Sequence, residues 1–289
     1  MSAIRQLSLL TCSIFLVLGI ISSSRLYAQD SNKPTVGPTI PFELDSGFLV
    51  VVNGQIGNLD DLKFILDTGT THSVIDRKVA DRLRLRRRPG EVMNVDRLIP
   101  VEWADIPELR VGPMRAEGFR IMVVKLTEYS EVAENADGII GLDLLSRSKK
   151  FTIDYDRRIV SFQVTEDGTA NHSLSGCLVV PIVVQGFPMY LAVDTGLQGI
   201  LLYENRLRKR LPKLRIEGVS TKVAMGRIRA TQVRLPGVRI VGAETVTTVL
   251  LIDGPNEEAL PGVDGYLGPA SLHAKRIEFD FDAGILRWQ

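Results

Sequence analysis

The sequence has little cysteine and little histidine. Of its 289 residues only Cys12 and Cys177 are cysteines, and Cys12 falls in an N-terminal apolar stretch. Cys177 then has no partner in the rest of the chain, which excludes a fold held by disulfides and leaves Cys177 as a small core residue. The three histidines are scattered and no CxxC or HExxH pattern is present, so we expect no metal site.

Bulk charge and phosphate-binding loops are also missing. The formal net charge is +1, which provides no general attraction to nucleic acid. No glycine-rich loop of the GxGxxG or P-loop form occurs. We therefore expect neither a nucleic-acid partner nor an organic cofactor. The remaining composition, 45% hydrophobic and 24% charged, is that of an ordinary globular protein.

The N-terminal segment differs from the rest of the chain. Arg5 precedes an apolar stretch over residues 7–21, and small and polar residues follow up to Ala28. This order is typical of a secretory signal peptide, and we predict one at residues 1–28, with cleavage after Ala28. An uncleaved single anchor is the alternative. In either case we expect an exported protein, which is periplasmic or secreted after cleavage and stays tethered if the anchor is kept.

One pattern occurs twice at equal spacing. The segments FILDTGTTHSVID and LAVDTGLQGILLY each carry Asp-Thr-Gly after an apolar run, and Asp67 and Asp194 lie 127 residues apart (194 − 67). The segments ADGIIGLDLL and VDGYLGPASL keep the same offset of 127 between Asp137 and Asp264 (264 − 137). Two similar alternating segments follow, FTIDYDRRIVSF and IEFDFDAGILRW. Signatures that keep one register predict an internal duplication.

The duplication suggests two lobes. We predict a first lobe at residues 45–162 and a second at 177–289, with linkers at 29–44 and 163–176. Short runs rich in branched apolar residues predict strands, with short helices only after each Asp-Thr-Gly strand and each downstream glycine signature. Asn53-Gly54 is a strong signal for a tight hairpin. The predicted fold class is all-β.

The order of these motifs resembles a known family. An apolar run, then Asp-Thr-Gly, then two apolar residues before a downstream glycine are similar to one lobe of a pepsin-like or retropepsin-like aspartic protease. The chain looks like two such lobes fused. The resemblance implies two related β-barrel-like lobes, closed or partly closed, with an active cleft between them. A single Asp-Thr-Gly also occurs as a strand-ending turn, whereas two in register with their glycine signatures are specific.

A pair of aspartates suits the hydrolysis of peptide bonds. The reaction needs a base that activates water and an acid that protonates the carbonyl oxygen and the leaving nitrogen. One carboxyl cannot do both, whereas two adjacent carboxyls share one proton because like charges at close range do not both ionise. Asp67 and Asp194 are therefore the candidate catalytic residues, and they should titrate as one unit. We predict an aspartic endopeptidase that acts on peptide or protein substrates.

The residues around each aspartate have matching roles. A glycine after Asp-Thr lacks a Cβ and permits a tight turn close to carboxylate and substrate. The resemblance implies that the threonine hydroxyls cross between the lobes and bond the opposite loop, and that the downstream glycines lie on strands that brace the loops. The candidate supporting residues are Thr68, Gly69, Thr70, Thr195 and Gly196, and the bracing residues are Gly141 and Gly268.

The two copies differ directly after the tripeptide, where Thr70 corresponds to Leu197. A hydroxyl at this position can bond the carboxylate and favour its ionised form, so we expect Thr70 to support a charged Asp67. Leu197 cannot, which predicts a less acidic pair that acts at weakly acid to neutral pH. The same leucine leaves open a non-catalytic peptide-binding protein. A third interpretation is an envelope scaffold, in which neither aspartate has a chemical role.

Weaker signals concern the surface. Residues 90–103 and 220–233 are candidates for hairpins that close over a substrate, and we expect Trp103 to pack in the core or at its rim. Basic stretches follow each Asp-Thr-Gly loop, at residues 76–90 and 204–215. We interpret them as solvated faces of short helices, with peripheral contact to an anionic membrane as the alternative. We expect a monomer.

Overall fold

Strands make up most of the structure. A computed structural model describes residues 37–94, 97–129, 135–164, 177–225, 228–240, 242, 244–255 and 260–289. Within these residues the strands form three sheets and the helices are short. The predicted all-β class with a few short helices is confirmed.

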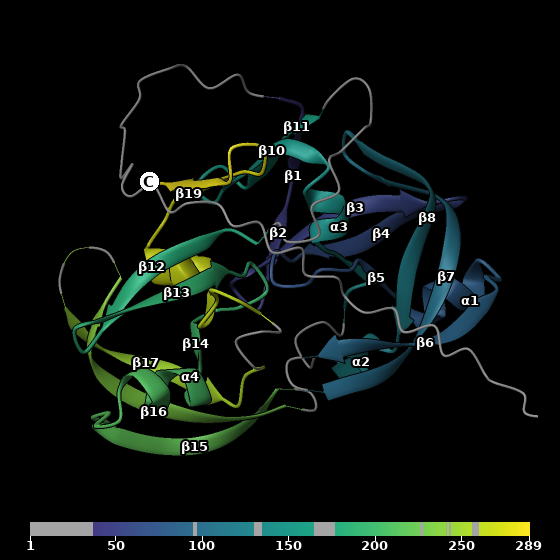
Figure 1. The fold of residues 1–289 in the computed structure, drawn as a ribbon. Coiled ribbons are helices and arrows are strands. Elements are labelled where there is room, and N and C mark those ends of the chain that lie inside the picture. Colours follow the sequence, from purple (N-terminus) through teal and green to yellow (C-terminus); the bar gives the residue numbers. More distant parts are fainter. Residues whose placement is uncertain are drawn as a thin grey trace, which may run out of the picture. The chain divides into compact units, whose positions relative to one another are not determined.

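The first sheet contains the first Asp-Thr-Gly loop. It has eight strands in the order β2-β3-β4-β9-β5-β8-β7-β6, drawn in purple to teal in Figure 1. The strands are β2 (Glu43–Asp45), β3 (Leu49–Ile56), β4 (Leu59–Leu66), β9 (Gly138–Ile140), β5 (Val74–Asp76), β8 (Met114–Val124), β7 (Arg97–Val111) and β6 (Arg87–Asn94).

The second sheet contains the second Asp-Thr-Gly loop. It has seven strands in the order β12-β13-β18-β14-β17-β16-β15, drawn mainly in green in Figure 1. The strands are β12 (Val179–Val184), β13 (Phe187–Val193), β18 (Gly265–Leu267), β14 (Ile200–Tyr203), β17 (Thr245–Ile252), β16 (Ile228–Arg239) and β15 (Gly218–Met225).

The two sheets repeat one pattern of strand pairing. β4 pairs in parallel with β9 as β13 does with β18, and β5 pairs in parallel with β8 as β14 does with β17. An additional pairing of β3 with β7 partly closes the first sheet, and β12 with β16 closes the second in the same way. Such equal orders are what an internal duplication produces. The lobe boundaries themselves stay a prediction.

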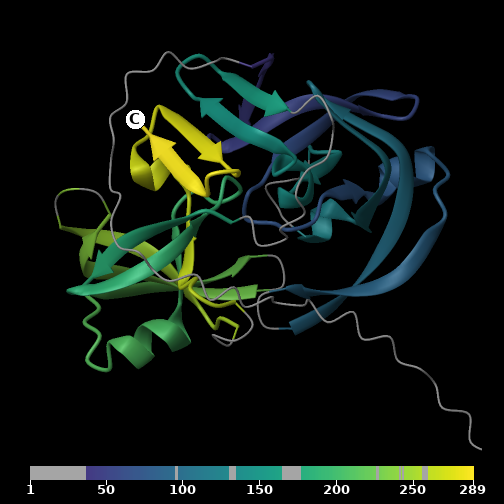
Figure 2. The same ribbon diagram turned by 45° about the horizontal axis from the view of Figure 1, so that its top comes forward.

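A third sheet takes strands from both copies. Its five strands are β1 (Thr39–Pro41), β11 (Ile159–Val164), β10 (Ser148–Asp154), β19 (Arg276–Asp280) and β20 (Ile285–Trp288), in this order. β10 pairs antiparallel with β19, and Phe151 lies opposite Phe279 with ring centroids 5.0 Å apart. Figure 2 shows this sheet as teal strands of the first copy and yellow strands of the second. The alternating segments of the two copies thus bind each other.

Short helices follow the strands at the predicted places. α1 (Arg77–Arg82) and α4 (Glu204–Arg210) follow the Asp-Thr-Gly loops, while α3 (Leu142–Leu145) and the 3₁₀ helix η2 (Pro269–Leu272) follow the glycine signatures; α2 is Leu126–Tyr129. Asp76 caps α1, since its side chain accepts from the amide of Lys78 at 2.8 Å.

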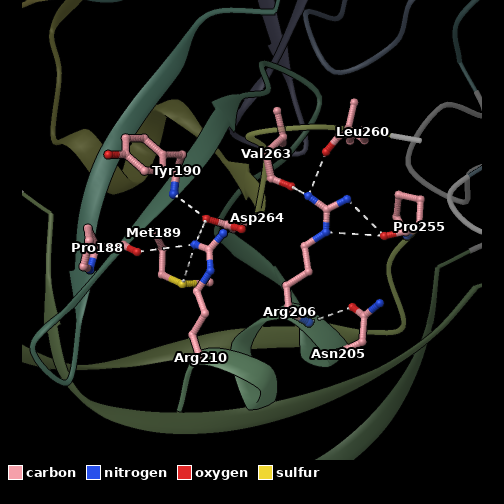
Figure 3. Close-up of polar contacts among 10 residues, drawn as sticks. All are labelled: Pro188, Met189, Tyr190, Asn205, Arg206, Arg210, Pro255, Leu260, Val263 and Asp264. Atoms are coloured by element: carbon pink, nitrogen blue, oxygen red, sulfur yellow. Dashed lines mark hydrogen bonds and ion pairs between the residues drawn. The ribbon is translucent and has the colours of Figure 1, made fainter. Parts of the chain in front are cut away.

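The basic stretch in α4 is not wholly solvated, contrary to our interpretation. Arg206 is only 3% exposed. Its guanidinium donates to the carbonyls of Pro255, Leu260 and Val263 (Figure 3). The guanidinium also lies over the ring of Tyr203. A buried guanidinium is tolerated because carbonyl oxygens replace its water. This arginine therefore fixes the backbone that precedes Asp264.

The core consists of the inward side chains of the strands. Along β12, Val180, Ile182 and Val184 are buried while the residues between them are more exposed, as alternation along a strand requires. Phe151 stacks on Phe162 and Phe279 in the third sheet. Each fully buried phenylalanine contributes about 1.5–3 kcal/mol to folding.

The hairpin predicted at Asn53-Gly54 is wrong. Both residues lie inside β3, and the chain turns at Gly57, which has a φ of +56°. A Cβ on Gly54 would lie 2.7 Å from the carbonyl oxygen of Arg110 and 2.9 Å from the ring of Phe64. The glycine is required by this close approach and not by a turn.

Some predictions fall outside the described residues. These are the signal peptide at 1–28, the first half of the linker at 29–44 and most of the linker at 163–176. Among the described residues, no helix has the length and apolar character needed to span a bilayer.

Candidate active site

Equivalent strand ends hold the two aspartates. Asp67 follows β4 and its amide donates to the carbonyl of Ile140 in β9 at 3.0 Å. Asp194 follows β13 and its amide donates to the carbonyl of Leu267 in β18, also at 3.0 Å. Each aspartate thus continues the parallel ladder of its own sheet by one hydrogen bond, which fixes where its side chain begins.

The threonines join the two loops reciprocally. The amide of Thr68 donates to the hydroxyl of Thr195 at 3.0 Å, and the amide of Thr195 donates to the hydroxyl of Thr68 at 3.1 Å. The Thr68 hydroxyl donates to the carbonyl of Val193 at 2.7 Å, and that of Thr195 donates to Leu66 at 2.6 Å. Both threonines are buried. These four bonds are the crossing that the resemblance implies.

The glycines bring each carboxyl against the other loop. The amide of Gly69 donates to Asp67 Oδ1 at 2.8 Å, and that of Gly196 donates to Asp194 Oδ1 at 2.8 Å. A Cβ on Gly69 would lie 2.3 Å from Asp194 Cγ, and one on Gly196 would lie 2.8 Å from Asp67 Cγ. Because any side chain would collide with the opposite carboxyl, glycine is required at both positions.

The two carboxyls form a hydrogen bond with each other. Burial raises the pKa of Asp67 above its usual 3.8, although hydrogen bonds from Asp194 and from the amides of Gly69, Thr70 and Gly196 oppose this rise. Burial also raises the pKa of Asp194 well above 3.8, and the charge of Asp67 and the hydrogen bond to it raise that pKa further. Burial therefore disfavours the charged form of both carboxyls, and the coupled pair titrates as one unit.

Backbone amides, and not a hydroxyl, support the two carboxyls unequally. The Thr70 hydroxyl donates to the carbonyl of His72 at 3.4 Å, so our expectation that it supports Asp67 is wrong. The Thr70 amide does this instead, by a bond that lowers the pKa of Asp67. The matching amide of Leu197 donates at 3.2 Å to the backbone carbonyl of Asp194 and leaves that carboxyl without this support.

The bracing glycines lie directly behind the loops. A Cβ on Gly141 would lie 2.8 Å from the carbonyl carbon of His72, and one on Gly268 would lie 2.0 Å from the carbonyl oxygen of Leu197. The amide of Gly268 donates to the carbonyl of Gly199 at 2.7 Å. The structure thus puts both glycines in the place that the resemblance implies.

Sequence reasoning missed a polar brace in the first copy. Ser73 donates from its hydroxyl to Asp143 Oδ1 at 2.6 Å and accepts from the amide of Gly141 at 3.0 Å. Burial raises the pKa of Asp143, against the effect of the bonds from Ser73. The second copy has Ile200 and Ala270 at these positions. The sequence signal for this brace was that both polar residues of the first copy are replaced by apolar ones in the second.

A pair of tyrosines near Asp194 was missed as well. Tyr203 and Tyr266 meet edge to face with ring centroids 6.1 Å apart. Burial raises the pKa of both hydroxyls, which bond each other, and the nearby charge of Asp194 adds to the rise. Tyr266 takes the place that Ile139 has in the first copy. The surroundings of the two aspartates therefore differ in polarity.

Both stretches proposed to cover a substrate belong to hairpins. β6 pairs with β7 up to Asn94 and Arg97, and β15 pairs with β16 up to Met225 and Ile228. Trp103 in β7 packs at the rim of a core cluster, as expected, and meets the ring of His72 edge to face at 5.2 Å. The first hairpin is thereby in contact with the loop that carries Asp67.

No group of three or more metal-binding side chains is clustered within the described part of the chain. The sequence model of the aspartyl protease family matches residues 50–144. This match confirms the resemblance to aspartic proteases for the first copy. No curated protein matches the chain.

A similar solved structure is a retropepsin-like aspartic protease from Rickettsia conorii. The sequence identity is 16% and the TM-score is 0.33, over 44% of this chain and 90% of that chain.

Proposed function

We propose that this chain is an exported aspartic endopeptidase in which Asp67 and Asp194 activate water together. The observation that carries the proposal is the reciprocal threonine exchange, which holds two carboxyls with raised pKa values against each other. The aspartyl protease family match over residues 50–144 supports the same class of reaction.

In this proposal the unequal amide support gives each aspartate its role. Asp67, supported by three backbone amides, accepts a proton from the attacking water. Asp194 donates its proton to the carbonyl oxygen of the substrate, so that a tetrahedral diol forms without a free oxyanion. Asp67, now protonated, then gives its proton to the leaving nitrogen, and Asp194 regains one from the diol. The resting state of the pair is thus restored.

Cleavage of a diverse peptide library between pH 3 and pH 8 tests the proposal. Asp67→Asn and Asp194→Asn should each lose at least about 10²-fold in activity, because either change removes an acid–base group. Asp282→Asn removes an exposed carboxyl from a turn and is the matched control, which should keep full activity. Folding of each variant is checked by circular dichroism.

The pH profile tests the raised pKa values of the pair. Because the pKa values of both carboxyls are raised, we expect activity to persist at weakly acid to neutral pH. An optimum well below pH 4 would contradict this. If the folded wild type cuts nothing but binds library peptides, the chain is the non-catalytic peptide-binding protein instead.

Export is part of the proposal and rests on the signal-peptide pattern of residues 1–28. Expression of the full chain followed by cell fractionation and N-terminal sequencing tests it. We expect an exported form that begins at Gln29. Full-length chain in the exported fraction would favour the uncleaved anchor, and full-length chain in the cytoplasm would contradict export.

A further inference from the structure

The β12–β13 hairpin has an apolar outer side. Pro181 lies opposite Tyr190 and Val183 opposite Pro188, on the side away from the buried residues of the two strands. Val179 is 41% exposed, Tyr190 43%, and Phe187 next to the turn 46%. We call this surface the hairpin face; it consists of Val179, Pro181, Val183, Pro188 and Tyr190 on the outer side, together with Phe187 at the turn, where it lies opposite the buried Val184.

The first copy serves as an internal comparison. In its β3–β4 hairpin, Asn53 lies opposite Lys63, as Pro181 lies opposite Tyr190 in the second copy. The positions of Phe187 and Pro188 are occupied by Asp60 and Asp61. Where this side of the first hairpin is exposed, at Asn53 and Lys63, it is polar, as is normal for a surface in water. The duplicated fold therefore does not itself require the hairpin face to be apolar, and its composition points to a partner.

Basic residues border the hairpin face. Figure 3 shows Arg210 reaching from α4 to β13, where its guanidinium donates to the carbonyl of Pro188 at 3.5 Å and pairs with Asp264 at 2.6 Å. At the turn, the side-chain amide of Gln185 donates to the carbonyl of Arg215 at 2.6 Å, and the Arg215 amide donates back at 3.1 Å. Arg239 in β16 lies opposite Val183.

The border has a net positive charge. Lys213, Arg215 and Arg239 are exposed, and within the part of the chain that the structure describes no carboxylate pairs with them. Of the nearby acidic groups, Glu204 pairs with Arg208 at 2.6 Å, Glu217 with Arg234 at 4.0 Å and Asp264 with Arg210. Glu244 is exposed beside Thr245, which lies opposite Val238, and the three cations outnumber it. Cations beside exposed aromatic and aliphatic side chains match the two layers of an anionic lipid surface.

We propose that the hairpin face docks on an anionic lipid bilayer. The aromatic rings of Phe187 and Tyr190 enter the boundary between headgroups and acyl chains, where amphipathic rings are favoured. Lys213, Arg215 and Arg239 lie over the phosphates and attract the surface within a Debye length. This contact goes beyond peptide cleavage and does not depend on it. It also does not need the N-terminal apolar stretch.

Binding to vesicles tests the proposal. Val36–Gln289 form one compact unit, so residues 29–289 keep every contact described above. The purified protein is mixed with vesicles of phosphatidylcholine alone or with about a third of phosphatidylglycerol, and bound protein is measured by flotation. We expect binding to the anionic vesicles, weaker binding in high salt and little binding to the neutral ones.

Matched variants separate the apolar and charged contributions. Phe187→Ser/Tyr190→Ser and Lys213→Glu/Arg215→Glu should each weaken binding at least about tenfold. Asp60→Ser/Lys63→Ser changes the equivalent sites of the first copy without changing net charge, and should bind like the wild type. Near-ultraviolet circular dichroism confirms that each variant is folded.

Three outcomes would overturn the proposal. The wild type could fail to float with anionic vesicles. The serine double variant could bind as well as the wild type, which would make the contact a matter of charge alone. The wild type could instead form a dimer in analytical ultracentrifugation, lost in the serine variant and without vesicle binding, which would assign the hairpin face to a second copy of the chain.

Discussion

Replacing Thr195 by valine should destabilise the protein strongly, although the side chain keeps nearly the same shape. Thr195 is 1% exposed. Its hydroxyl accepts from the amide of Thr68 at 3.0 Å and donates to the carbonyl of Leu66 at 2.6 Å. Valine leaves both backbone groups buried and unbonded. Each such group costs about 1–3 kcal/mol, so after local relaxation we expect a loss of about 2–4 kcal/mol in the free energy of unfolding.

Urea denaturation measures this loss, and a thermal melt should show a fall of about 6–12 °C for a loss of ~3 kcal/mol in a chain of this size. Thr68→Val removes the equivalent pair of bonds, to Thr195 and Val193, and should cost a similar amount. Thr39→Val changes an exposed threonine in β1 and should stay within about 0.5 kcal/mol of the wild type.

Activity gives a second readout of the same change. Because the threonines set the positions of the two carboxyls, a shift of about 1 Å at either loop should reduce peptide cleavage about 10²-fold. Two results would refute the reasoning. One is a Thr195→Val variant as stable as Thr39→Val. The other is a destabilised variant with unchanged activity below its melting temperature, which would show that the threonines do not position the acids.

Three further predictions concern single residues. Asp194→Asn should raise the free energy of unfolding at pH 7. The folded-state pKa of Asp194 is raised well above 3.8, so wild-type stability falls as the pH rises from the unfolded-state pKa to the folded-state pKa, whereas asparagine does not ionise. Thermal melts near pH 3 should show no gain. Gly268→Ala should prevent folding or lower the free energy of unfolding by more than about 3 kcal/mol, because its Cβ would lie 2.0 Å from the carbonyl oxygen of Leu197. The control is Gly199→Ala, whose Cβ would meet no atom within 4 Å and which should be nearly neutral in urea titration. Ser73→Ala removes the hydrogen bonds to Asp143 and Gly141, so it should lower the free energy of unfolding by about 1–3 kcal/mol and reduce peptide cleavage. If neither stability nor cleavage changes, these bonds do not brace the loop.

Spacing within the sequence predicted the features that repeat. The equal offset between Asp67 and Asp194 predicted the duplication, and the repeated strand order agrees with it. The first of the short helices, α1, begins at a polar cap, Asp76, at the end of the preceding strand. Repetition is visible in a sequence because each copy serves as a standard for the other.

Features that depend on distant neighbours could not be predicted. Asn53-Gly54 carries a local turn signal, yet Gly54 is set by the approach of Arg110 from another strand. The bond between Ser73 and Asp143 joins residues that are 70 positions apart and leaves no local pattern. The burial of Arg206 depends on carbonyls of a later loop. Local propensity contains none of this information.

The pairing of β10 with β19 has a consequence for how the two halves could diverge. Equivalent strands face each other there, with Phe151 against Phe279, as a twofold axis requires. In a dimer of identical chains, any substitution on one side of such an axis also appears on the other. Here a single polypeptide carries both sides, so each can mutate by itself. Ile139 at the position equivalent to Tyr266, and Lys63 at the position equivalent to Tyr190, are differences that two identical chains could not have.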